Sequence, residues 1–318
     1  RIRLHQRSMK EIDIKQLIQG YSNGLPNTNQ PKKELIAGVT NLKAGISAIS
    51  GGADTIYILG DYRFKEGLKL IGELYKHCST SGCSLYYVLP QITRDAENNA
   101  LESMLHQAVE KNSGLGLGLV ISNIGHVKIA ERLQNIQVRG NFTLNALNSA
   151  AIDFFIKRGL HSLCVSPELN LTQIKELSKA TPMQLEAVIY GYLPAMITEY
   201  CPSSAVSDCN ACESGCHRNH GIIDERNKLF KVISLGNCKT AILNSDVLCV
   251  YDNISNVIEG GISKLRMDFY NEEEDDIFEI VKAYKDKTLN PWDNKESEAI
   301  EAVKKNGFTK GHYFRGIE

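Results

Sequence analysis

One local pattern recurs along the chain and limits the folds that are open to it. An amphipathic segment ends at a glycine, and a short apolar segment follows at once, as in "AISGGADTIYIL", "FIKRGLHSLCVS" and "VIEGGISKLRMDF". A left-handed glycine commonly ends a helix, and a short apolar run rich in β-branched residues is typical of a strand buried on both faces. Repetition of this unit predicts alternating strands and helices, and therefore a parallel sheet.

Hydrophobic periodicity extends the pattern to eight strands. The expected strands are 34–39, 54–59, 84–89, 117–122, 136–142, 162–166, 185–190 and 264–269. The expected helices are 41–51, 66–80, 96–111, 124–134, 148–158 and 172–179. This alternation favours an α/β fold with a closed (β/α)8 barrel of the TIM type over an open sheet. The chain of 318 residues is long enough for such a barrel.

The alternation of strands and helices, and the places where it stops, predict three parts of the chain and one insertion. The parts are an N-terminal helix and linker (1–33), the barrel (34–290) and a C-terminal tail (291–318). The N-terminal helix is expected at 9–20. After the seventh strand, a cysteine-rich loop at 199–245 interrupts the alternation, and its "IIDERNKLFKVI" predicts a hairpin with a turn near Asn227. Loops that follow barrel strands form the face where barrel enzymes work, so this insertion is expected to be functional.

Composition narrows the setting of the chain. The 36 basic and 37 acidic residues leave a net charge of -1, which argues against bulk electrostatic binding to nucleic acid or membranes. This charge balance does not exclude a local groove that binds one folded RNA. No apolar run of about 18 residues and no signal peptide is seen, and nine cysteines fit a reducing compartment. We expect a cytoplasmic protein and, because the chain begins at Arg1, a piece of a longer one.

The stretch "EYCPSSAVSDCNACESGCHRNH" predicts an inorganic centre. Its cysteines are Cys201, Cys209, Cys212 and Cys216. Cys238 follows the predicted hairpin, which returns the chain to the same place. Four thiolates that converge from separate segments can hold a tetrahedral zinc ion or a 4Fe-4S cluster, and the spacing leaves both open. His217 and His220 are further candidates for zinc ligands.

Other residues are candidates for catalysis or binding. Glu168 and Asn145 follow the sixth and fifth predicted strands, where barrel catalysts lie, although each could serve only as a cap or loop residue. Arg226 and Arg266 are candidate anchors for a carboxylate or phosphate, because a guanidinium can grip either with two hydrogen bonds. A surface ion pair is the competing role for each. No H-E-x-x-H, G-x-S-x-G or P-loop motif occurs.

Several segments resemble the peptidase U32, or collagenase-like, family. They are "ELIAGVTNLKAGISAISGGADTIYI", "GNFTLNALNSAAIDFFIKRGLHSLCVSPELNLTQIKEL", "VIYGYLPAMITEYCP" with the later "CESGC", "DER" and "CKTAILNS", and the terminal "GFTKGHYFRGIE". The chain resembles the second, diverged barrel of long members. Two segments depart from the family pattern, "AGVT" after the first strand and "FTLN" after the fifth.

The resemblance implies a barrel with a 4Fe-4S cluster. The implied ligands are Cys201, Cys212, Cys216 and Cys238, with Cys209 as the substitute for Cys212. Some family members hydroxylate RNA bases or the ubiquinone ring without dioxygen, and prephenate is the implicated oxygen source.

We therefore expect an iron–sulfur enzyme that hydroxylates a base of tRNA or rRNA, or a related aromatic substrate, without dioxygen. Its expected partners are RNA, a small carboxylate donor such as prephenate, and a partner domain or subunit of the same family. The alternatives are a U32-type peptidase and a non-catalytic domain of a larger protein, braced by a cluster or zinc.

Overall fold

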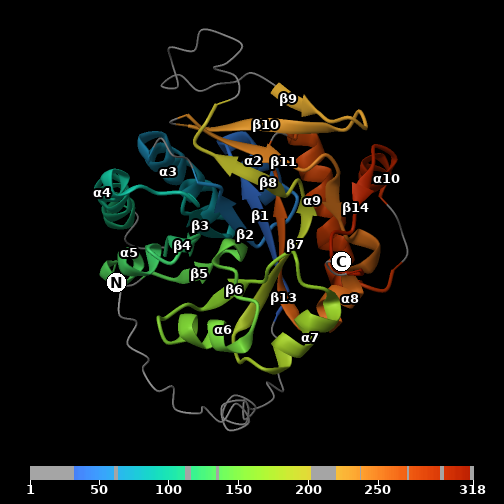
Figure 1. Ribbon diagram of the computed structural model, residues 1–318, viewed down its shortest axis with the longest axis horizontal. Coiled ribbons are helices and arrows are strands. Elements are labelled where there is room, and N and C mark those ends of the chain that lie inside the picture. Colours follow the sequence, from blue (N-terminus) through green and yellow to red (C-terminus); the bar gives the residue numbers. More distant parts are fainter. Residues whose placement is uncertain are drawn as a thin grey trace, which may run out of the picture.

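Eight parallel strands close into a barrel in the computed structural model, which confirms the predicted (β/α)8 architecture (Figure 1). The structure describes residues 32–60, 64–111, 116–133, 136–201, 220–236, 238–270, 272–293 and 297–315. The barrel strands are β1 (Glu34–Val39), β2 (Thr55–Ile58), β3 (Ser84–Val88), β4 (Gly118–Ile121), β5 (Val138–Gly140), β6 (Ser162–Cys164), β7 (Gln184–Gly191) and β13 (Ile262–Asp268). β13 pairs in parallel with both β7 and β1, which closes the barrel. The helix predicted at 9–20 lies outside the described residues.

Helices surround the barrel, most of them between successive strands and the last two after β13. They are α2 (Leu42–Ser50), α3 (Phe64–Ser81), α4 (Asp95–Lys111), α5 (His126–Arg132), α6 (Ser149–Ile156), α7 (Leu171–Lys179), α8 (Ile254–Glu259), α9 (Glu274–Leu289) and α10 (Glu298–Lys305). Short 3-10 turns occur at η1 (Phe142–Leu144) and η4 (Tyr251–Asn253). Among the described helices, none combines the length and the apolar character that a membrane crossing requires.

Local sequence signals explain these boundaries. In the three quoted units, the glycines at the helix ends, Gly52, Gly159 and Gly261, have φ of 100°, 80° and 92°, so the predicted left-handed stops are confirmed. Asparagine side chains begin three α-helices. Asn41 accepts from the Ala44 N–H, Asn148 accepts from the Ala151 N–H, and Asn170 forms a capping box with Gln173. Sequence and structure therefore agree at the ends of the repeating unit.

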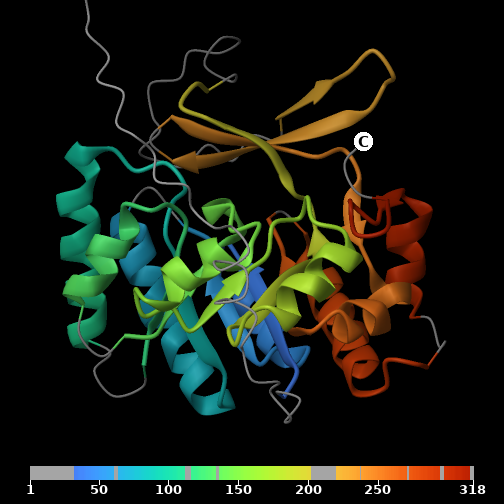
Figure 2. The ribbon, with the colours of Figure 1, turned by 60° about the horizontal axis from the view of Figure 1, so that its bottom comes forward.

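The insertion after β7 folds into a second sheet. Its strands are β8 (Pro194–Thr198), β9 (His220–Ile223), β10 (Leu229–Gly236) and β11 (Lys239–Leu243), in the spatial order β8-β11-β10-β9. β9 and β10 form the predicted hairpin, and Asn227 at its turn has φ of 58°. Because β8 follows directly from the end of β7, this four-stranded sheet lies across the mouth of the barrel, the end where the strands finish (Figure 2).

After this four-stranded sheet, which we call the roof, the chain adds two short strands to β7 at the side of the barrel. β12 (Val247–Cys249) pairs antiparallel with β7, and β14 (Phe308–Thr309) pairs in parallel with β12. Tyr313 is buried and donates its hydroxyl to the Val188 carbonyl at 2.6 Å. The C-terminal residues up to 315 therefore pack on the barrel.

The two faces of the barrel strands differ in chemistry. Outward-facing residues of the strands pack with the helices in a large apolar core. The interior has only a small apolar cluster, which includes Ile36, Tyr57, Tyr86, Val88 and Val120. The remaining interior positions are mostly polar or charged, and the candidate site is built on them.

Candidate active site at the mouth of the barrel

A pocket lies between the strand ends and the sheet that covers them. From the barrel it is lined by Leu59, Gly60, Val88, Leu89, Gln91, Ser122, Asn141, Phe142, Arg266 and Tyr270. From the roof it is lined by Pro194, Ile197, Leu235 and Ala241. The lining is largely apolar with a few convergent polar groups, which is the usual character of a small-molecule site.

Arg266 is the charged residue of this pocket. It is 1% exposed, so the surface ion pair considered for it is wrong. Its Nε donates to Asp268 Oδ1 at 2.7 Å, and its Nη1 donates to Asn141 Oδ1 at 2.9 Å and lies 3.5 Å from Glu186 Oε1. Burial opposes the charge, but the two carboxylates hold the pKa of the guanidinium above its usual value. No hydrogen bond joins Nη2 to a described residue, so this nitrogen is available to a ligand.

Asp268 occupies the last position of β13, where two glycines make room for it. A Cβ on Gly38 would overlap Asp268 Oδ1, and a Cβ on Gly191 would overlap the Asp268 carbonyl oxygen. The second oxygen, Oδ2, is buried without a hydrogen-bond partner among the described residues. A buried carboxylate oxygen with no protein partner is uncommon and costly, so this oxygen needs a further partner such as a water molecule or a ligand.

A column of polar side chains continues below this pair through the barrel. Tyr57 donates its hydroxyl to Glu186 Oε2 at 2.7 Å and accepts from Arg139 Nη1 at 3.1 Å. The guanidinium of Arg139 lies 4.0 Å from the centroid of the Tyr86 ring. Burial raises the pKa of the Glu186 carboxyl, and Arg266 and Arg139 oppose that shift. Glu186 therefore takes up a proton more readily than an ordinary glutamate does.

Glu34 anchors the column at the opposite end of the barrel. Its Oε1 accepts from Arg139 Nη1 at 2.8 Å and from Thr55 Oγ1 at 2.6 Å, and its Oε2 pairs with Lys264. Burial alone would raise the pKa of Glu34, but the two cations outweigh it and lower the pKa to about 2. The interior thus holds three carboxylates and three cations in one connected network.

Two of the predicted cluster ligands lie at adjacent strand ends. Thr198 at the end of β8 is opposite Thr240 of β11, and Thr240 Oγ1 also donates to the Tyr200 carbonyl at 2.9 Å. Cys201 follows the end of β8 by three residues, and Cys238 directly precedes Lys239, the first residue of β11. Cys201 is buried and Cys238 is exposed with φ of 58°.

The other cysteines of the motif, with His217, lie outside the described residues. They are Cys209, Cys212 and Cys216. Within the part of the chain that the structure describes, no three histidine, cysteine or acidic side chains gather as a metal site would require. The geometry of the full ligand set therefore stays a prediction.

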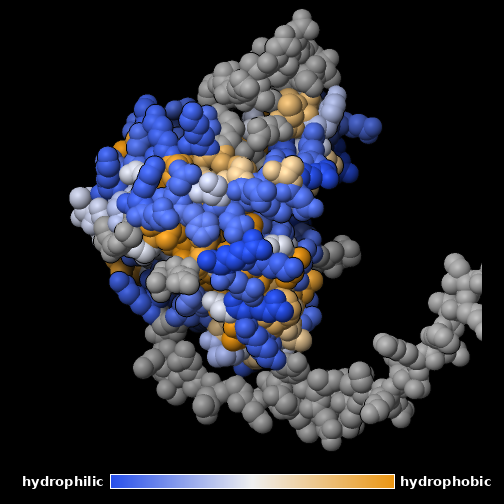
Figure 3. Space-filling view, turned by 90° about the vertical axis from the view of Figure 1, so that its left-hand side faces the viewer, coloured by the Kyte–Doolittle hydropathy of each residue, from blue (hydrophilic) through white to orange (hydrophobic). Residues whose placement is uncertain are grey.

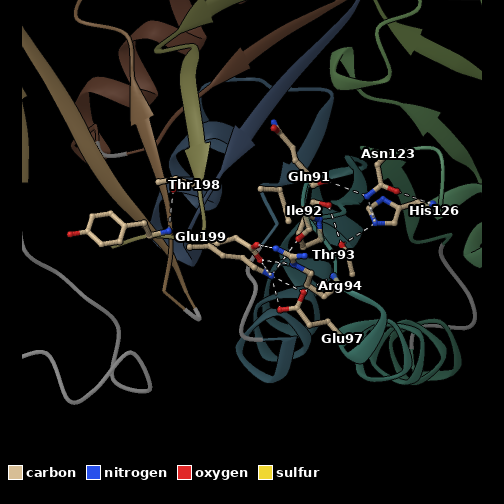
Figure 4. Close-up of polar contacts among 12 residues, drawn as sticks. Gln91, Ile92, Thr93, Arg94, Glu97, Asn123, His126, Thr198 and Glu199 are labelled. Carbon is tan, nitrogen blue, oxygen red and sulfur yellow. Dashed lines mark hydrogen bonds and ion pairs between the residues drawn. The ribbon is translucent and has the colours of Figure 1, made fainter. Parts of the chain in front are cut away.

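A buried lysine fixes both cysteine-bearing segments to the barrel. Lys239, next to Cys238, is 3% exposed and donates to both carboxylate oxygens of Glu97 on α4, at 2.6 and 2.7 Å. Glu199, two residues before Cys201, lies 3.9 Å from the same ammonium group and pairs with Arg94 (Figure 4). The start of α4 and the ends of β8 and β11 are therefore tied together by charge.

A buried histidine organises the neighbouring loops. His126 Nε2 lies 3.1 Å from Thr93 Oγ1 and 3.0 Å from Asn123 Nδ2, and its Nδ1 accepts from the Ser122 N–H at 3.3 Å (Figure 4). Asn123 also donates to the carbonyl of Gln91 at 3.2 Å. Burial lowers the pKa of His126 to about 4, so the ring is neutral at pH 7. Ser122 and Gln91, which line the pocket, are held in place by this group.

The remaining predicted site residues lie away from the pocket lining. Glu168 is exposed in the loop after β6, and Asn145 is exposed at the end of η1 with φ of 50°. Arg226 is exposed at the β9–β10 turn, where its N–H donates to Asp224 at 2.9 Å. Their proposed roles stay predictions, whereas Arg266 alone of the four lines the pocket.

Sequence reasoning missed most of the charged interior. Lys264, Arg266 and Asp268 occupy alternate positions of β13 and all point into the barrel, and Glu186 does the same in β7. Ionisable residues at alternate positions of an otherwise apolar strand are the signal that could have identified them.

Comparisons with known proteins identify the family to which the chain belongs. The chain is 22% identical over 307 residues to "tRNA hydroxylation protein P" of Helicobacter pylori, covering 89% of this chain and 72% of that protein. It is 24% identical over 177 residues to the protein of the same name from Haemophilus influenzae, covering 52% of this chain and 37% of that one. Among solved structures, the U32 peptidase Mk0906 is similar with a TM-score of 0.48 at 10% identity, covering 77% of this chain and 96% of that one. The sequence pattern of peptidase family U32 matches residues 40–317. Because that match includes most of the barrel and its roof, the chain belongs to peptidase family U32.

Proposed function

We propose that this chain hydroxylates a base of tRNA, with the base bound in the pocket at the mouth of the barrel. The names of the two curated relatives support a role in tRNA hydroxylation. The observation that carries the proposal is the buried Arg266–Asp268 pair, which opens into an apolar pocket beneath a roof whose strands lead to Cys201 and Cys238.

The pocket suits a flat aromatic ring and a small acid. Phe142, Leu59 and Ile197 offer apolar surface to a base, and proteins commonly read unstacked RNA bases in this way. Replacing a ring C–H by C–OH removes two electrons from the base, so a donor must deliver the oxygen and accept those electrons. The proposed donor is a small carboxylate such as prephenate, which Arg266 Nη2 would bind.

The proposed cofactor is a 4Fe-4S cluster, with zinc as the alternative. Cys201 and Cys238 would supply two of its four ligands, and the β8–β11 ladder supports this because it brings their segments together. Cys212 and Cys216 would supply the others, with Cys209 as the substitute for Cys212. When bound, such a cluster supplies electron transfer at the mouth of the barrel. The chain's own contribution is to orient the base, bind the donor and exclude water beneath the roof.

The test compares tRNA from cells that lack the gene with tRNA from cells that carry it, by mass spectrometry of nucleosides. Loss of one hydroxylated nucleoside, restored by the wild-type gene and not by Asp268→Asn, is the expected result. The Cys201→Ser and Cys238→Ser variants should also fail to restore it, whereas Cys83→Ser, a change to a cysteine outside the motif, should restore it. An unchanged nucleoside profile in the deletion strain would contradict the proposal.

The cofactor is tested separately on protein purified without oxygen. We expect iron and sulfide in the wild type and in Cys83→Ser, and their loss in Cys201→Ser and Cys238→Ser. A colourless sample that carries zinc would reject the cluster. Cleavage of collagen-like peptides by the purified chain, retained after the cysteine substitutions, would instead favour the peptidase alternative.

A further inference from the structure

A groove on the flank of the barrel collects lysines. It is lined by Lys65, Leu68, Lys69, Gly72, Glu73, Lys76 and Lys111. The four lysine side chains are exposed, and no ion pair or hydrogen bond of their ammonium groups to a described residue is found. With Glu73 as the single acid of the lining, the groove carries an excess of three positive charges. A chain with a net charge of -1 therefore concentrates cations at this place.

The lysines form a stripe rather than a random cluster. Lys65, Lys69 and Lys76 lie on α3, and the first and last of them are eleven residues apart, which is about 16 Å along a helix. Lys111 is the last residue of the neighbouring α4. Hydrophilic side chains cover much of this flank of the molecule (Figure 3).

The stripe begins close to the candidate active site. Gly60 lines the pocket, and Lys65 lines the groove only five residues later. Five residues span at most about 18 Å, so the upper end of the groove lies within a few nucleotides of the pocket. Because α3 starts at the mouth and runs toward the opposite end, the lysines extend away from the pocket down the flank.

We propose that this groove binds the phosphodiester backbone of the RNA whose base enters the pocket. The inference rests on the proposed function, and it adds a surface for the flanking nucleotides. Flexible ammonium groups without carboxylate partners among the described residues suit phosphates, and such contacts position an RNA without reading its sequence. The groove accounts for RNA binding by a chain whose overall charge is close to zero.

Gly72 offers a sharp test, because nothing lies within 4 Å of the position of an added Cβ. Gly72→Glu places a carboxylate in the groove, and Gly72→Gln adds a side chain of the same size without the charge. A second variant changes Lys65, Lys69, Lys76 and Lys111 to glutamine. Its matched control changes four other exposed lysines, Lys157, Lys175, Lys282 and Lys305, to glutamine.

Binding of bulk tRNA to the full chain is measured by fluorescence anisotropy over a range of salt concentrations. We expect the groove variant to bind tRNA at least about tenfold more weakly near 0.1 M salt, with a shallower salt slope by roughly one per lysine in contact. Gly72→Glu should weaken binding more than Gly72→Gln, and the control lysine variant should bind almost as the wild type does.

The outcomes separate this inference from the proposed function. If the groove variants bind tRNA as tightly as the wild type does, the proposed role of the groove is overturned and the proposed function is unaffected. Absence of any tRNA binding by the wild type would overturn both. Equal weakening by the groove and control variants would show that only overall charge matters, and it too would overturn the groove.

Discussion

The strongest test of the charged interior is replacement of Arg266 by methionine, which keeps an unbranched apolar stem and removes the charged guanidinium. Arg266, Asp268 and Glu186 are all 2% exposed or less, so the change leaves two carboxylates without their shared cation in a dry interior. Removing one partner from a buried ion pair costs about 3–5 kcal/mol, because the remaining charge stays desolvated. We expect the free energy of unfolding to fall by that amount at pH 7.

The assay is urea unfolding followed by circular dichroism, with Arg226→Met as the matched control. Arg226 is exposed at the β9–β10 turn, so its replacement should change the free energy of unfolding by no more than about 0.5 kcal/mol. The slope with urea should stay unchanged in both variants if only stability changes.

Two further measurements show whether orphaned charge is the cause. Adding Asp268→Asn to Arg266→Met removes one of the two carboxylates, so the double variant should be more stable than the single one. Lowering the pH should also reduce the deficit of Arg266→Met, because protonation neutralises the orphaned groups. A loss below about 1 kcal/mol, or a double variant that is the less stable of the two, would refute the reasoning.

Four other changes test separate parts of the molecule. The pKa of Glu34 is lowered to about 2, so the ionised carboxylate stabilises the fold by about 3 kcal/mol above pH 4.5, and this contribution is lost as the pH falls toward 2. In urea unfolding, the free energy of unfolding of Glu34→Gln should therefore lie furthest below that of the wild type at pH 7 and closest to it near pH 3. His126 stays neutral in the folded state down to about pH 4, whereas in the unfolded chain it takes up a proton below pH 6.5. The free energy of unfolding of the wild type should therefore fall by up to about 1.4 kcal/mol per pH unit between pH 6.5 and 4, and that of His126→Asn, measured in parallel, should not show this part of the fall. Gly38→Ala should displace the Asp268 carboxylate at a cost of about 1–3 kcal/mol and abolish complementation in the nucleoside assay, whereas full complementation would argue against a role for that carboxylate. Lys239→Met should destabilise the chain by about 1–3 kcal/mol and lower the iron content of protein purified without oxygen; full iron content would show that the lysine does not position the cysteine segments.

Much of the barrel follows from local signals that the sequence displays. The strand expected at 34–39 coincides with β1, and the helix expected at 172–179 differs from α7 by one residue, since the Asn170 capping box marks its start. Buried parallel strands are continuous apolar runs, and glycines end the preceding helices, so neither signal depends on distant parts of the chain.

The roof could not be predicted in the same way. β8 and β11 are five residues each, and their partnership joins Thr198 to Thr240 across a long intervening segment. Such short runs carry no periodic signal, and their pairing is decided by tertiary packing. The hairpin was predicted because its two strands are consecutive and its turn has the residues that turns favour, with Asn227 in the left-handed conformation.

The charged interior was hidden for a different reason. Arg266 suggests solvent when read alone, since arginine is rarely buried without partners. Its partners come from distant strands, Glu186 on β7 and Asn141 after β5, and only closure of the barrel brings them to it. The partners of Arg266 could not be predicted because they depend on the register of β13 between β1 and β7, which no local pattern in the sequence reveals.

The insertion after β7 supplies both the cover of the pocket and the segments that carry Cys201 and Cys238. Three of the four residues that cover the pocket, Pro194 and Ile197 on β8 and Ala241 on β11, belong to the two strands that lead to Cys201 and Cys238. The fourth, Leu235, lies on β10. A roof that excludes water strengthens the attraction between Arg266 and any anion beneath it, because charges interact more strongly where the dielectric constant is low. The same two strands therefore shield the pocket and carry the segments of Cys201 and Cys238. If the proposed function holds, a change that loosens their pairing is expected to weaken ligand binding and cofactor retention together.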